Sequence, residues 1–439
     1  MRHTHFALLL TFSLCSLAGA QSDDWSRWRG PSGNGGSADL EAPTDWTEED
    51  NVRWRIDLPG AGSSTPVIWG EHLFLTTAVP TDRTPEGADG AEPVDSGRRS
   101  PPPTNIYEFW TLAIKRSSGE VAWSSKLTET VPHEGGHATN TQASASPVTD
   151  GEHLFVFLGS RGLFCLDMQG KTIWSKDLGR MQTRREFGEG ASPALHGDTL
   201  VVVWDHEGED FILALDKSTG KELWRKSRDE PTTWVTPRIV PDGERHLVVV
   251  PATNATRAYD LANGEVVWTV DGMTTNCIPT AMYAEGVVFM MSGYRGNTLQ
   301  AVRVEGAKGD LRKSESVLWE HHKGTSYVPS GALMDGLIYF LRGNNGVLSC
   351  VDAGTGEELY AGQRLGELRS VYSSVTVVGD YLYICSREGL TAVVSRGPEF
   401  TLVAVNSLDA VFDASPVAAG GDLYLRGTSS LYCIGEDRD

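Results

Sequence analysis

The sequence is short of basic residues relative to acidic ones, has few cysteines and contains no long hydrophobic run. Its 439 residues include 38 lysines and arginines against 58 aspartates and glutamates, which gives a formal net charge of −20. Nucleic acids and anionic membrane surfaces are bound through basic patches, so this charge argues against both partners. The apolar run at residues 6–17 is too short to span a membrane. We therefore expect no nucleic-acid partner and no membrane span.

The first twenty residues have the composition of a secretory signal peptide. Arg2 and two histidines precede the apolar run, and Ala18-Gly19-Ala20 forms a small-residue cleavage site. Cys15 follows a leucine, whereas a bacterial lipoprotein signal has a small residue directly before its cysteine. We predict that residues 1–20 are removed and that the protein is exported without a lipid, to the periplasm or the cell exterior.

The six cysteines include neither an adjacent pair nor a CxxCH haem-attachment motif. Cys165, Cys350 and Cys433 occupy matching places in LFCLD, LSCVD and LYCIG. Matching places in different repeats lie farther apart than the Cα separation of about 7 Å that a disulfide tolerates. We therefore expect buried free thiols, because cysteine packs as a small apolar residue.

What the sequence does contain is a repeat of four short strands, shown most clearly by residues 191–227. Runs of four to eight apolar residues are separated there by Gly, Asp and Ser turns, which is the pattern of antiparallel hairpins. The pattern recurs eight times. The first strands of the units are expected to begin near Ser64, Ala145, Ala191, Val235, Ile278, Ser330, Ser373 and Ala414.

The last hairpin of most units has a glycine four residues before an aromatic residue. Glycine supplies the positive φ of such a turn, and the aromatic ring is expected to dock between neighbouring sheets. The pairs are Gly119 and Trp123, Gly170 and Trp174, Gly220 and Trp224, Gly264 and Trp268, and Gly356 and Tyr360.

The two ends of the chain are complementary. The last unit ends after three strands, while residues 52–58 form a fourth strand with no preceding three. Pairing them closes a ring and removes exposed sheet edges. We predict an all-β fold, an eight-bladed β-propeller of four-stranded antiparallel blades at residues 52–436. An N-terminal surface segment at residues 21–51 precedes it, and residues 79–104 form a flexible insert.

The units ALDKSTGKELW, AYDLANGEVVW and AIKRSSGEVAW resemble the tryptophan-docking PQQ-like repeat of quinoprotein-type propellers. WSRWRGP near the N-terminus and HATNTQASASP are similar to segments of an exported bacterial PQQ-like group common in planctomycetes. The resemblance covers residues 25–436. It implies either a quinone-dependent dehydrogenase or a non-enzymatic protein such as the outer-membrane assembly lipoprotein of this family, since both share the architecture.

The resemblance also implies which features form the cofactor site in the enzymes of the family. They hold the quinone against a tryptophan, cover it with a disulfide between adjacent cysteines and anchor it through calcium. This chain has no adjacent cysteines, so we predict no cofactor, no metal and no catalytic residues. A PQQ-dependent oxidoreductase using calcium remains the alternative.

Two other sequence patterns resemble metal sites, but we interpret both as structural loops. His133 and His137 match HExxH by letter, but Pro132 and two internal glycines oppose the helix that zinc binding by this motif requires. Residues 205–210 form an acidic hairpin, which we expect to be a solvated turn rather than a cation site. A zinc-dependent hydrolase is the third function class.

The loops that lead into the first strands differ from unit to unit. Small residues follow them, as eight strands converging on an axis require: Thr65, Ser146, Ser192, Thr236, Ala281, Gly331, Ser374 and Ser415. The preceding larger residues are not explained by packing, and they are our candidates for ligand binding: His137, Asn140, Glu189, Trp234, Asn276, Tyr327, Tyr372 and Asp413. We predict a monomer that binds an envelope protein or a carbohydrate at this axial face.

Overall fold

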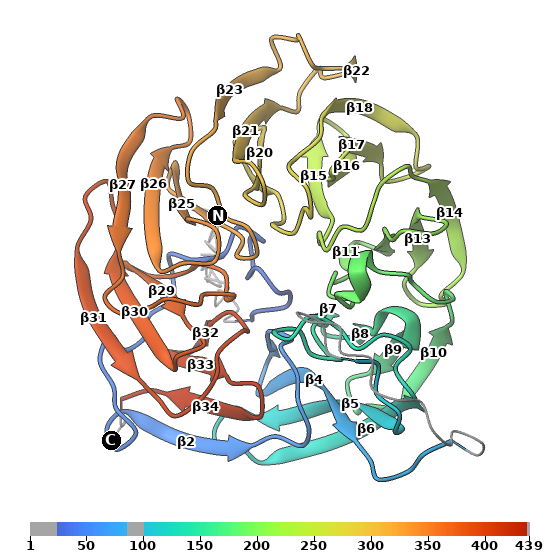
Figure 1. Ribbon diagram of the computed structural model, residues 1–439, viewed down its shortest axis with the longest axis vertical. Helices are drawn as coiled ribbons and strands as arrows, with labels where there is room; N and C mark the ends of the chain where they lie inside the picture. The colour runs from blue at the N-terminus through green and yellow to red at the C-terminus, as the bar shows by residue number, and fades with distance from the viewer. Residues whose placement is uncertain (1–23, 86–100, 437–439) are drawn as a thin grey trace, which may run out of the picture.

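The computed structural model describes residues 24–85 and 101–436 and arranges them in a closed ring of eight sheets (Figure 1). The predicted signal peptide at residues 1–20 lies outside the described residues, as does most of the insert at residues 79–104. Each blade has four antiparallel strands, so the predicted all-β, eight-bladed β-propeller is confirmed. Within the described residues, no helix is long and apolar enough to cross a membrane.

Blades 1 to 4 follow the chain from the inner strand outward. Blade 1 comprises β3 (Val67–Trp69), β4 (His72–Pro80), β5 (Tyr107–Lys115) and β6 (Val121–Thr130). Blade 2 comprises β7 (Val148–Thr149), β8 (His153–Phe157), β9 (Leu163–Asp167) and β10 (Thr172–Lys176). Blade 3 comprises β11 (Ala194–His196), β12 (Thr199–Trp204), β13 (Phe211–Asp216) and β14 (Glu222–Ser227). Blade 4 comprises β15 (Arg238–Asp242), β16 (Arg245–Val250), β17 (Ala255–Asp260) and β18 (Val266–Asp271), and β22 (Gly309–Asp310) joins its outer edge.

Blades 5 to 8 repeat the arrangement. Blade 5 comprises β19 (Met282–Ala284), β20 (Val287–Ser292), β21 (Thr298–Arg303) and β23 (Val317–His321). Blade 6 comprises β24 (Ala332–Met334), β25 (Leu337–Leu341), β26 (Val347–Asp352) and β27 (Glu358–Arg364). Blade 7 comprises β28 (Thr376–Val378), β29 (Tyr381–Cys385), β30 (Leu390–Ser395) and β31 (Leu402–Ser407), with β1 (Gly36–Ser37) at its inner edge. Blade 8 comprises β32 (Val417–Ala419), β33 (Asp422–Arg426), β34 (Ser430–Ile434) and β2 (Val52–Asp57). Two 3-10 turns, η1 (Gly159–Arg161) and η2 (Arg184–Glu186), lie in the connections.

The ring closes where the sequence predicts. Strand β2 pairs antiparallel with β34 and places Trp54 opposite Cys433. Figure 1 shows this blue N-terminal strand completing the red C-terminal blade. The N-terminus of the ring therefore supplies the outer edge of its last sheet, and neither end of the array is left unpaired.

Five docking tryptophans contact the turn glycine of the next blade, which explains the spacing of the repeat: Trp54, Trp123, Trp174, Trp224 and Trp319. The indole Nε1 of Trp54 donates to the carbonyl oxygen of Arg116, 2.8 Å away, and its ring lies where a Cβ on Gly119 would stand. Trp123 makes the same contacts with Met168 and Gly170. The glycines have positive φ. A side chain at these turns would both strain the backbone and displace the indole.

A ring of hydroxyl hydrogen bonds links all eight blades around the axis. Backbone amides donate to the hydroxyl of the next blade at 2.9 to 3.1 Å, in the order Thr65 to Ser146, Ser146 to Ser192, Ser192 to Thr236, Thr280 to Ser330, Ser330 to Ser374, Ser374 to Ser415 and Ser415 to Thr65. Between blades 4 and 5 the hydroxyl of Thr280 donates to the carbonyl oxygen of Thr236, 2.7 Å away.

Two members of this ring differ from the predicted ones. Thr280 and Ser330 occupy the hydroxyl positions in blades 5 and 6, one residue before the predicted Ala281 and Gly331. Smallness was the basis of that prediction, but the position also requires a hydroxyl. The inner strands themselves begin a few residues after the predicted starts, because the hydroxyl residues lie ahead of the strands.

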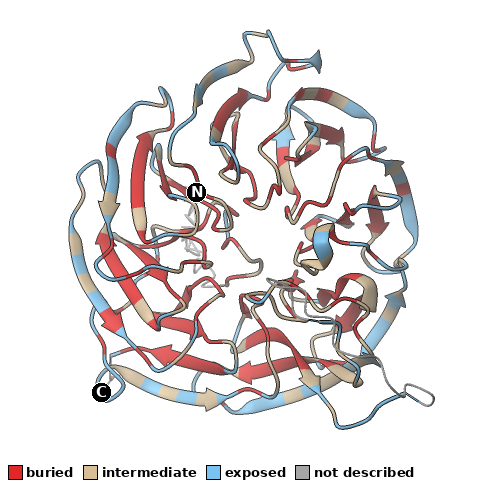
Figure 2. Cartoon of the chain, in the orientation of Figure 1, coloured by how far each residue is buried: buried red, intermediate tan, exposed pale blue. Residues whose placement is uncertain are grey.

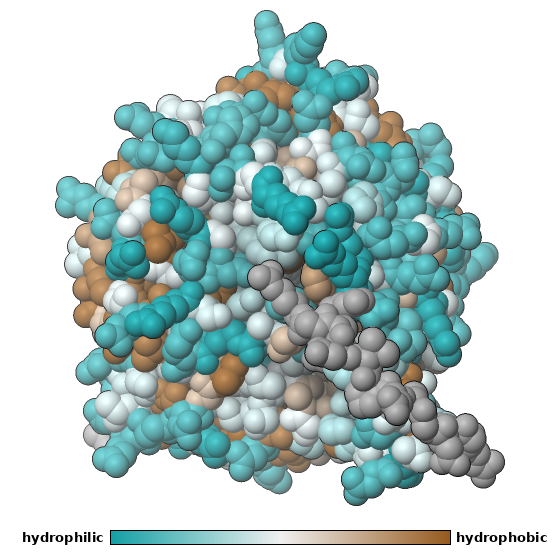
Figure 3. Space-filling model, in the orientation of Figure 1, coloured by the Kyte–Doolittle hydropathy of each residue, from teal (hydrophilic) through white to brown (hydrophobic). Residues whose placement is uncertain are grey.

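Burial decreases from the inner strands to the outer ones (Figure 2). Strands such as β8 and β33 are buried throughout, because neighbouring blades cover both of their faces. The outermost strands alternate between exposed and half-buried residues. Apolar side chains remain exposed near β27 and β31, at the edge of the face seen in Figure 3, among them Leu359, Val403 and Val405.

The N-terminal segment, residues 24–51, runs across one end of the axis. The guanidinium of Arg29 is buried there and donates to the carbonyl oxygens of Gly331 and Val375, 2.7 and 2.8 Å away. The amide of Asn34 donates to the carbonyl oxygen of Tyr283 in β19 (2.8 Å), and β1 pairs with β28. These contacts join inner strands of blades 5, 6 and 7 at the end opposite the loops that enter those strands.

Deleting residues 21–60 tests the closure. The deletion removes β2 and the segment across the axis, so blade 8 loses its outer strand and an unpaired edge is exposed. We expect a large drop in the midpoint of thermal unfolding, or aggregation, relative to the chain that starts at residue 21. A truncated protein with an unchanged midpoint would contradict closure by β2.

The cysteines give a second test. The five cysteines of the described chain are unpaired and buried. Burial raises the pKa of four of these thiols to about 12 and also raises the pKa of Cys277. We expect five reactive thiols in non-reducing denaturant and slow reaction in the native protein, since the thiolate is the reactive species. A count of three or fewer would show a disulfide.

Candidate functional site

A cavity of about 230 Å³ lies on the axis and is bounded by residues from both ends of the chain and from most blades. Hydroxyl-ring residues such as Thr65, Ser146 and Ser415 form part of its wall. Trp28 of the N-terminal segment contributes to its lining, and the loops that lead into the inner strands surround its mouth. The two ends of the axis are therefore unequal, because one is crossed by the N-terminal segment.

The structure brings seven of the eight candidate residues to this cavity, namely His137, Asn140, Glu189, Trp234, Tyr327, Tyr372 and Asp413. Asn276 is not part of the lining, but its side-chain amide donates to the Tyr327 hydroxyl, 3.3 Å away. The seven come from six different loops. Sequence reasoning placed these residues together because each precedes an inner strand, and all inner strands converge on the axis.

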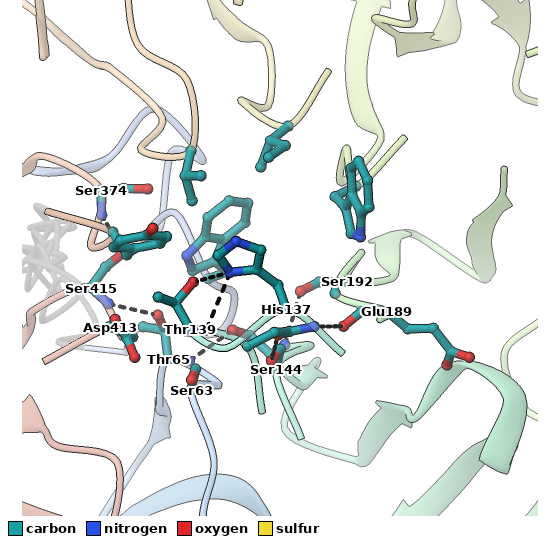
Figure 4. Close-up of a pocket in the computed structure, with 18 of the residues that line it drawn as sticks. Ser63, Thr65, His137, Thr139, Ser144, Glu189, Ser192, Ser374, Asp413 and Ser415 are labelled. Carbon is teal, nitrogen blue, oxygen red and sulfur yellow. Dashed lines mark hydrogen bonds between the residues drawn. The ribbon is translucent and has the colours of Figure 1, made fainter. Parts of the chain in front are cut away.

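Glu189 and Asn140 shape the wall rather than present free polar groups to the cavity. The Glu189 carboxylate pairs with Arg161 (2.8 Å) and accepts hydrogen bonds from Ser160. Figure 4 shows this side chain extending away from the other labelled residues. The Asn140 amide donates to the carbonyl oxygen of Phe187 (3.1 Å), and its Oδ1 accepts a hydrogen bond from Ser144. The Glu189 carboxylate is thus occupied by Arg161 and Ser160, and its role in binding a ligand stays a prediction.

His137 is held by its own loop. The backbone amide of Thr139 donates to its Nδ1 (3.2 Å), and the Thr139 hydroxyl lies 2.8 Å from the same nitrogen (Figure 4). A ring nitrogen that accepts a hydrogen bond from an amide carries no proton, so the neutral ring is protonated at Nε2. The ring of Phe187 packs edge-on against the imidazole, with centroids 5.1 Å apart.

The aromatic side chains at the mouth have fixed positions. The indole Nε1 of Trp234 donates to the carbonyl oxygen of Gly188, 2.7 Å away. Tyr327 stacks on Tyr294 with ring centroids 4.6 Å apart. The guanidinium of Arg387 lies 5.5 Å from the centre of the Tyr372 ring. These contacts leave little rotamer freedom, so the cavity is formed before any ligand arrives.

Asp413 also lines the cavity, and its carboxylate, unlike that of Glu189, is not fully hydrogen-bonded by the described residues. Its side chain is 6% exposed, and its Oδ1 lies 3.6 Å from Nε of Arg387, too far for a hydrogen bond. Among the described residues, Oδ1 has no hydrogen-bond partner, and neither has the buried Nη1 of Arg387. Burial raises the pKa of Asp413 to about 6, against the opposing effect of Arg387.

The sequence contained no clear signal for several of these residues. Trp28 lies in the N-terminal segment, outside the repeats, and it lines the cavity. Arg387 lies in the turn between β29 and β30 rather than in a loop that enters an inner strand, and Phe187 lies two residues before the candidate Glu189. The sequence cannot show that an oxygen of the buried Asp413 lacks a hydrogen-bond partner, because this depends on how the neighbouring loop packs against it.

The HExxH segment is a loop, as expected. His133 donates from Nε2 to the carbonyl oxygen of Met181 (2.7 Å), and the buried Glu134 carboxylate accepts hydrogen bonds from the amide and hydroxyl of Thr183. The two histidines have separate partners. Among the described residues, no group of three or more His, Cys, Asp or Glu side chains could hold a metal ion.

The acidic hairpin at residues 205–210 differs from its predicted solvated state. Asp205 is buried and pairs with the buried Arg228, with 2.6 Å between Oδ1 and Nε. Thr233 donates a further hydrogen bond to Oδ2 of Asp205 (2.7 Å). His206 is also buried, whereas Glu207 and Glu209 are exposed. Asp205 thus packs between blades 3 and 4, Asp210 is half-buried, and Glu207 and Glu209 form the exposed turn.

A family match and a curated relative both indicate one protein family. Residues 165–397, more than half of the chain, match the family described as outer membrane protein assembly factor BamB. A curated relative of that name from Francisella salina is 28% identical over 106 residues, which make up 24% of this chain and 18% of the relative. The match thus spans about a fifth of the relative's length.

Three solved structures share the architecture. BamB from Moraxella catarrhalis has a TM-score of 0.53 at 14% identity, covering 82% of this chain and 98% of that one. A europium-containing methanol dehydrogenase has a TM-score of 0.62 at 10% identity, covering 92% and 89%. The computationally designed Ika8 protein has a TM-score of 0.55 at 11% identity, covering 86% and 98%. At these identities the likeness shows the fold alone, and it does not select an activity.

Replacing Asp413 by asparagine tests its burial. Because the folded-state pKa is raised to about 6, the unfolded chain loses its proton first, and stability should fall as pH rises from about 4 to about 6. We expect Asp413→Asn to raise the free energy of unfolding by up to about 3 kcal/mol at pH 7 and by little at pH 4. Denaturant titrations at both pH values measure this.

The matched control is Asp380→Asn, whose side chain is 88% exposed. We expect it to leave the free energy of unfolding nearly unchanged at both pH values, because exposed ion pairs contribute little. An effect of Asp413→Asn that is the same at pH 4 and pH 7 would contradict a raised pKa.

Proposed function

This chain belongs to the PQQ-like propeller family of the outer membrane protein assembly factor BamB, and we propose that it is an exported, non-catalytic binding or scaffold protein of the cell envelope. In this proposal the open mouth of the axial cavity receives a group presented by an envelope protein or a carbohydrate. The signal-like residues 1–20 and the family support export, and the fold offers a rigid ring with one mouth lined by unlike side chains.

The lining of the cavity is the observation that carries this proposal. Structural contacts recur from blade to blade, as the hydroxyl ring and most tryptophan contacts do, whereas the residues at the mouth follow no such repeat. Aromatic rings held in place around a few polar atoms are typical of a preformed recognition site. Asp413 is the clearest case, because it is buried there without a hydrogen bond to Oδ1 from any described residue.

The cavity does not fit the cofactor of the family's dehydrogenases. Calcium takes six to eight oxygen ligands, usually several carboxylates, and a single carboxylate faces this cavity because Glu189 is paired with Arg161. The fused-ring quinone with its calcium would need more oxygen donors than these residues supply.

Reconstitution separates the two functions. Protein lacking residues 1–20 is incubated with PQQ and calcium, and dye reduction is measured across a panel of alcohols and sugars. We expect no substrate-dependent turnover, because the calcium ligands are not provided. Turnover that depends on both PQQ and substrate would replace the binding function with an oxidoreductase.

Capture from solubilised envelope fractions tests binding at the mouth. Immobilised wild type is compared with Trp234→Ala plus Tyr327→Ala, which removes two rings from the mouth. The control carries Leu223→Ala plus Val403→Ala, two exposed positions on outer strands. We expect the mouth variant to lose partners that the control retains. A mouth variant that unfolds like wild type and keeps every partner would place the site elsewhere.

A further inference from the structure

One unmatched acceptor in the wall of the cavity, Asp413, lies beside one unmatched donor, Arg387, which lines the adjoining larger cavity. Oδ1 of Asp413 and Nη1 of Arg387 are both buried, and neither has a hydrogen-bond partner among the described residues. The two side chains face each other at 3.6 Å between Oδ1 and Nε, which is an ion contact without a hydrogen bond. Figure 4 shows Asp413 beside Thr65 and Ser415, on the side of the cavity opposite Glu189.

Buried polar groups of native proteins are nearly always hydrogen-bonded, and an unmatched one marks a missing partner. Other carboxylates around the mouth are satisfied: Glu134 by Thr183, and Glu189 by Arg161 and Ser160. Asp413 therefore differs from its neighbours in having capacity left for a ligand.

The charge of the pair selects the kind of ligand. A cation would be attracted by Asp413 and repelled by Arg387, and an anion would be repelled by Asp413 and attracted by Arg387. For either charged ligand, the favourable electrostatic energy with one side chain is offset by the unfavourable energy with the other. A neutral group with hydroxyls satisfies both at once, because a hydroxyl donates one hydrogen bond and accepts others. The pair thus favours a neutral ligand with several hydroxyl groups.

The remaining surface of the cavity is aromatic. Tyr372 and Tyr327 each have one face covered, by Arg387 and by Tyr294, and present their remaining surface to the cavity. Trp28 and Trp234 line it as well. The cavity of about 230 Å³ has room for a small ring, and it shares Thr139, Asn140 and Asp413 with an adjoining cavity of about 1010 Å³.

From these observations we propose that the axial cavity binds a single neutral sugar ring of an envelope glycan. One hydroxyl donates to Asp413, a hydroxyl oxygen accepts from Arg387, and the apolar C–H face of the ring lies against the aromatic side chains. This inference rests on the proposed binding function and names the ligand class. A peptide side chain at the same place is the competing occupant that the experiment distinguishes.

Saturation-transfer NMR and calorimetry on the full chain test the proposal with the methyl glycosides of glucose, galactose, mannose and N-acetylglucosamine. Tetramethylammonium chloride and sodium glutamate serve as the cationic and anionic probes. We expect at least one neutral glycoside to bind and neither charged probe to do so. Saturation by tetramethylammonium or glutamate, with no glycoside bound, would overturn the assignment.

Two variants locate the site. We expect Asp413→Asn and Arg387→Gln each to weaken the glycoside by at least about tenfold, since each replaces a hydrogen bond to a charged group. Asp380→Asn, an exposed change of the same kind as the first, should bind as wild type. Because the two site variants change opposite charges, loss of affinity in both cannot arise from net charge. Unchanged affinity in both folded variants would refute the site.

Competition separates this inference from the proposed function. The glycoside that binds is added to the envelope capture, and it should displace the partners that depend on Trp234 and Tyr327. If those partners are captured and no glycoside binds or competes, the mouth binds a protein segment: the proposed function stands and the sugar assignment fails. If the partners ignore the mouth variant but the glycosides bind, the sugar site stands and the protein-scaffold role moves to another surface.

Discussion

The hydrogen bond from an inner backbone amide to a hydroxyl of the next blade is the contact on which the rest of the structure depends. It recurs around the axis from Thr65 through Ser415 and back to Thr65, with one reversed step between Thr236 and Thr280. A larger side chain would push the strands apart, and a side chain without a hydroxyl would leave a buried amide unsatisfied. The spacing of the blades follows from this ring, and with it the width of the cavity and the positions of the loops at its mouth.

The fold could be predicted because its determinants are repeated and local. The glycine turn with its tryptophan recurs in successive units, and the orphan strand with Trp54 indicates how the ring closes. The hydroxyl ring was predicted less accurately, because small size alone does not distinguish Thr280 from Ala281. Contacts between loops could not be predicted, because the sequences of these loops are not repeated. The pairing of Glu189 with Arg161, which withdraws that carboxylate from the cavity, depends on two loops that no periodicity relates.

The N-terminal segment breaks the symmetry of the ring, and the site depends on that. It fills the space beside blade 7, whose outer strand lacks a docking tryptophan: Trp46 is buried there and stacks on Tyr383 with ring centroids 6.4 Å apart. Farther along the same segment, Arg29 bonds two inner strands and Trp28 reaches the cavity. All inner strands run in the same direction, so the two ends of the ring differ even without the segment. The segment crosses one end, and the proposed recognition site lies at the other.

Residues that recur from blade to blade stabilise the fold, and residues that do not recur line the proposed recognition site. Asp413 affects both. A buried carboxylate destabilises a fold unless hydrogen bonds or a close cation compensate. Asp205 has both from Arg228, with Thr233 adding a further bond, and Glu134 has Thr183. Asp413 has a cation at a longer distance and an oxygen without a described partner, although an asparagine or serine of similar size would fill the space without charge. Packing therefore does not account for an acid at this position, whereas the proposed ligand hydroxyl would.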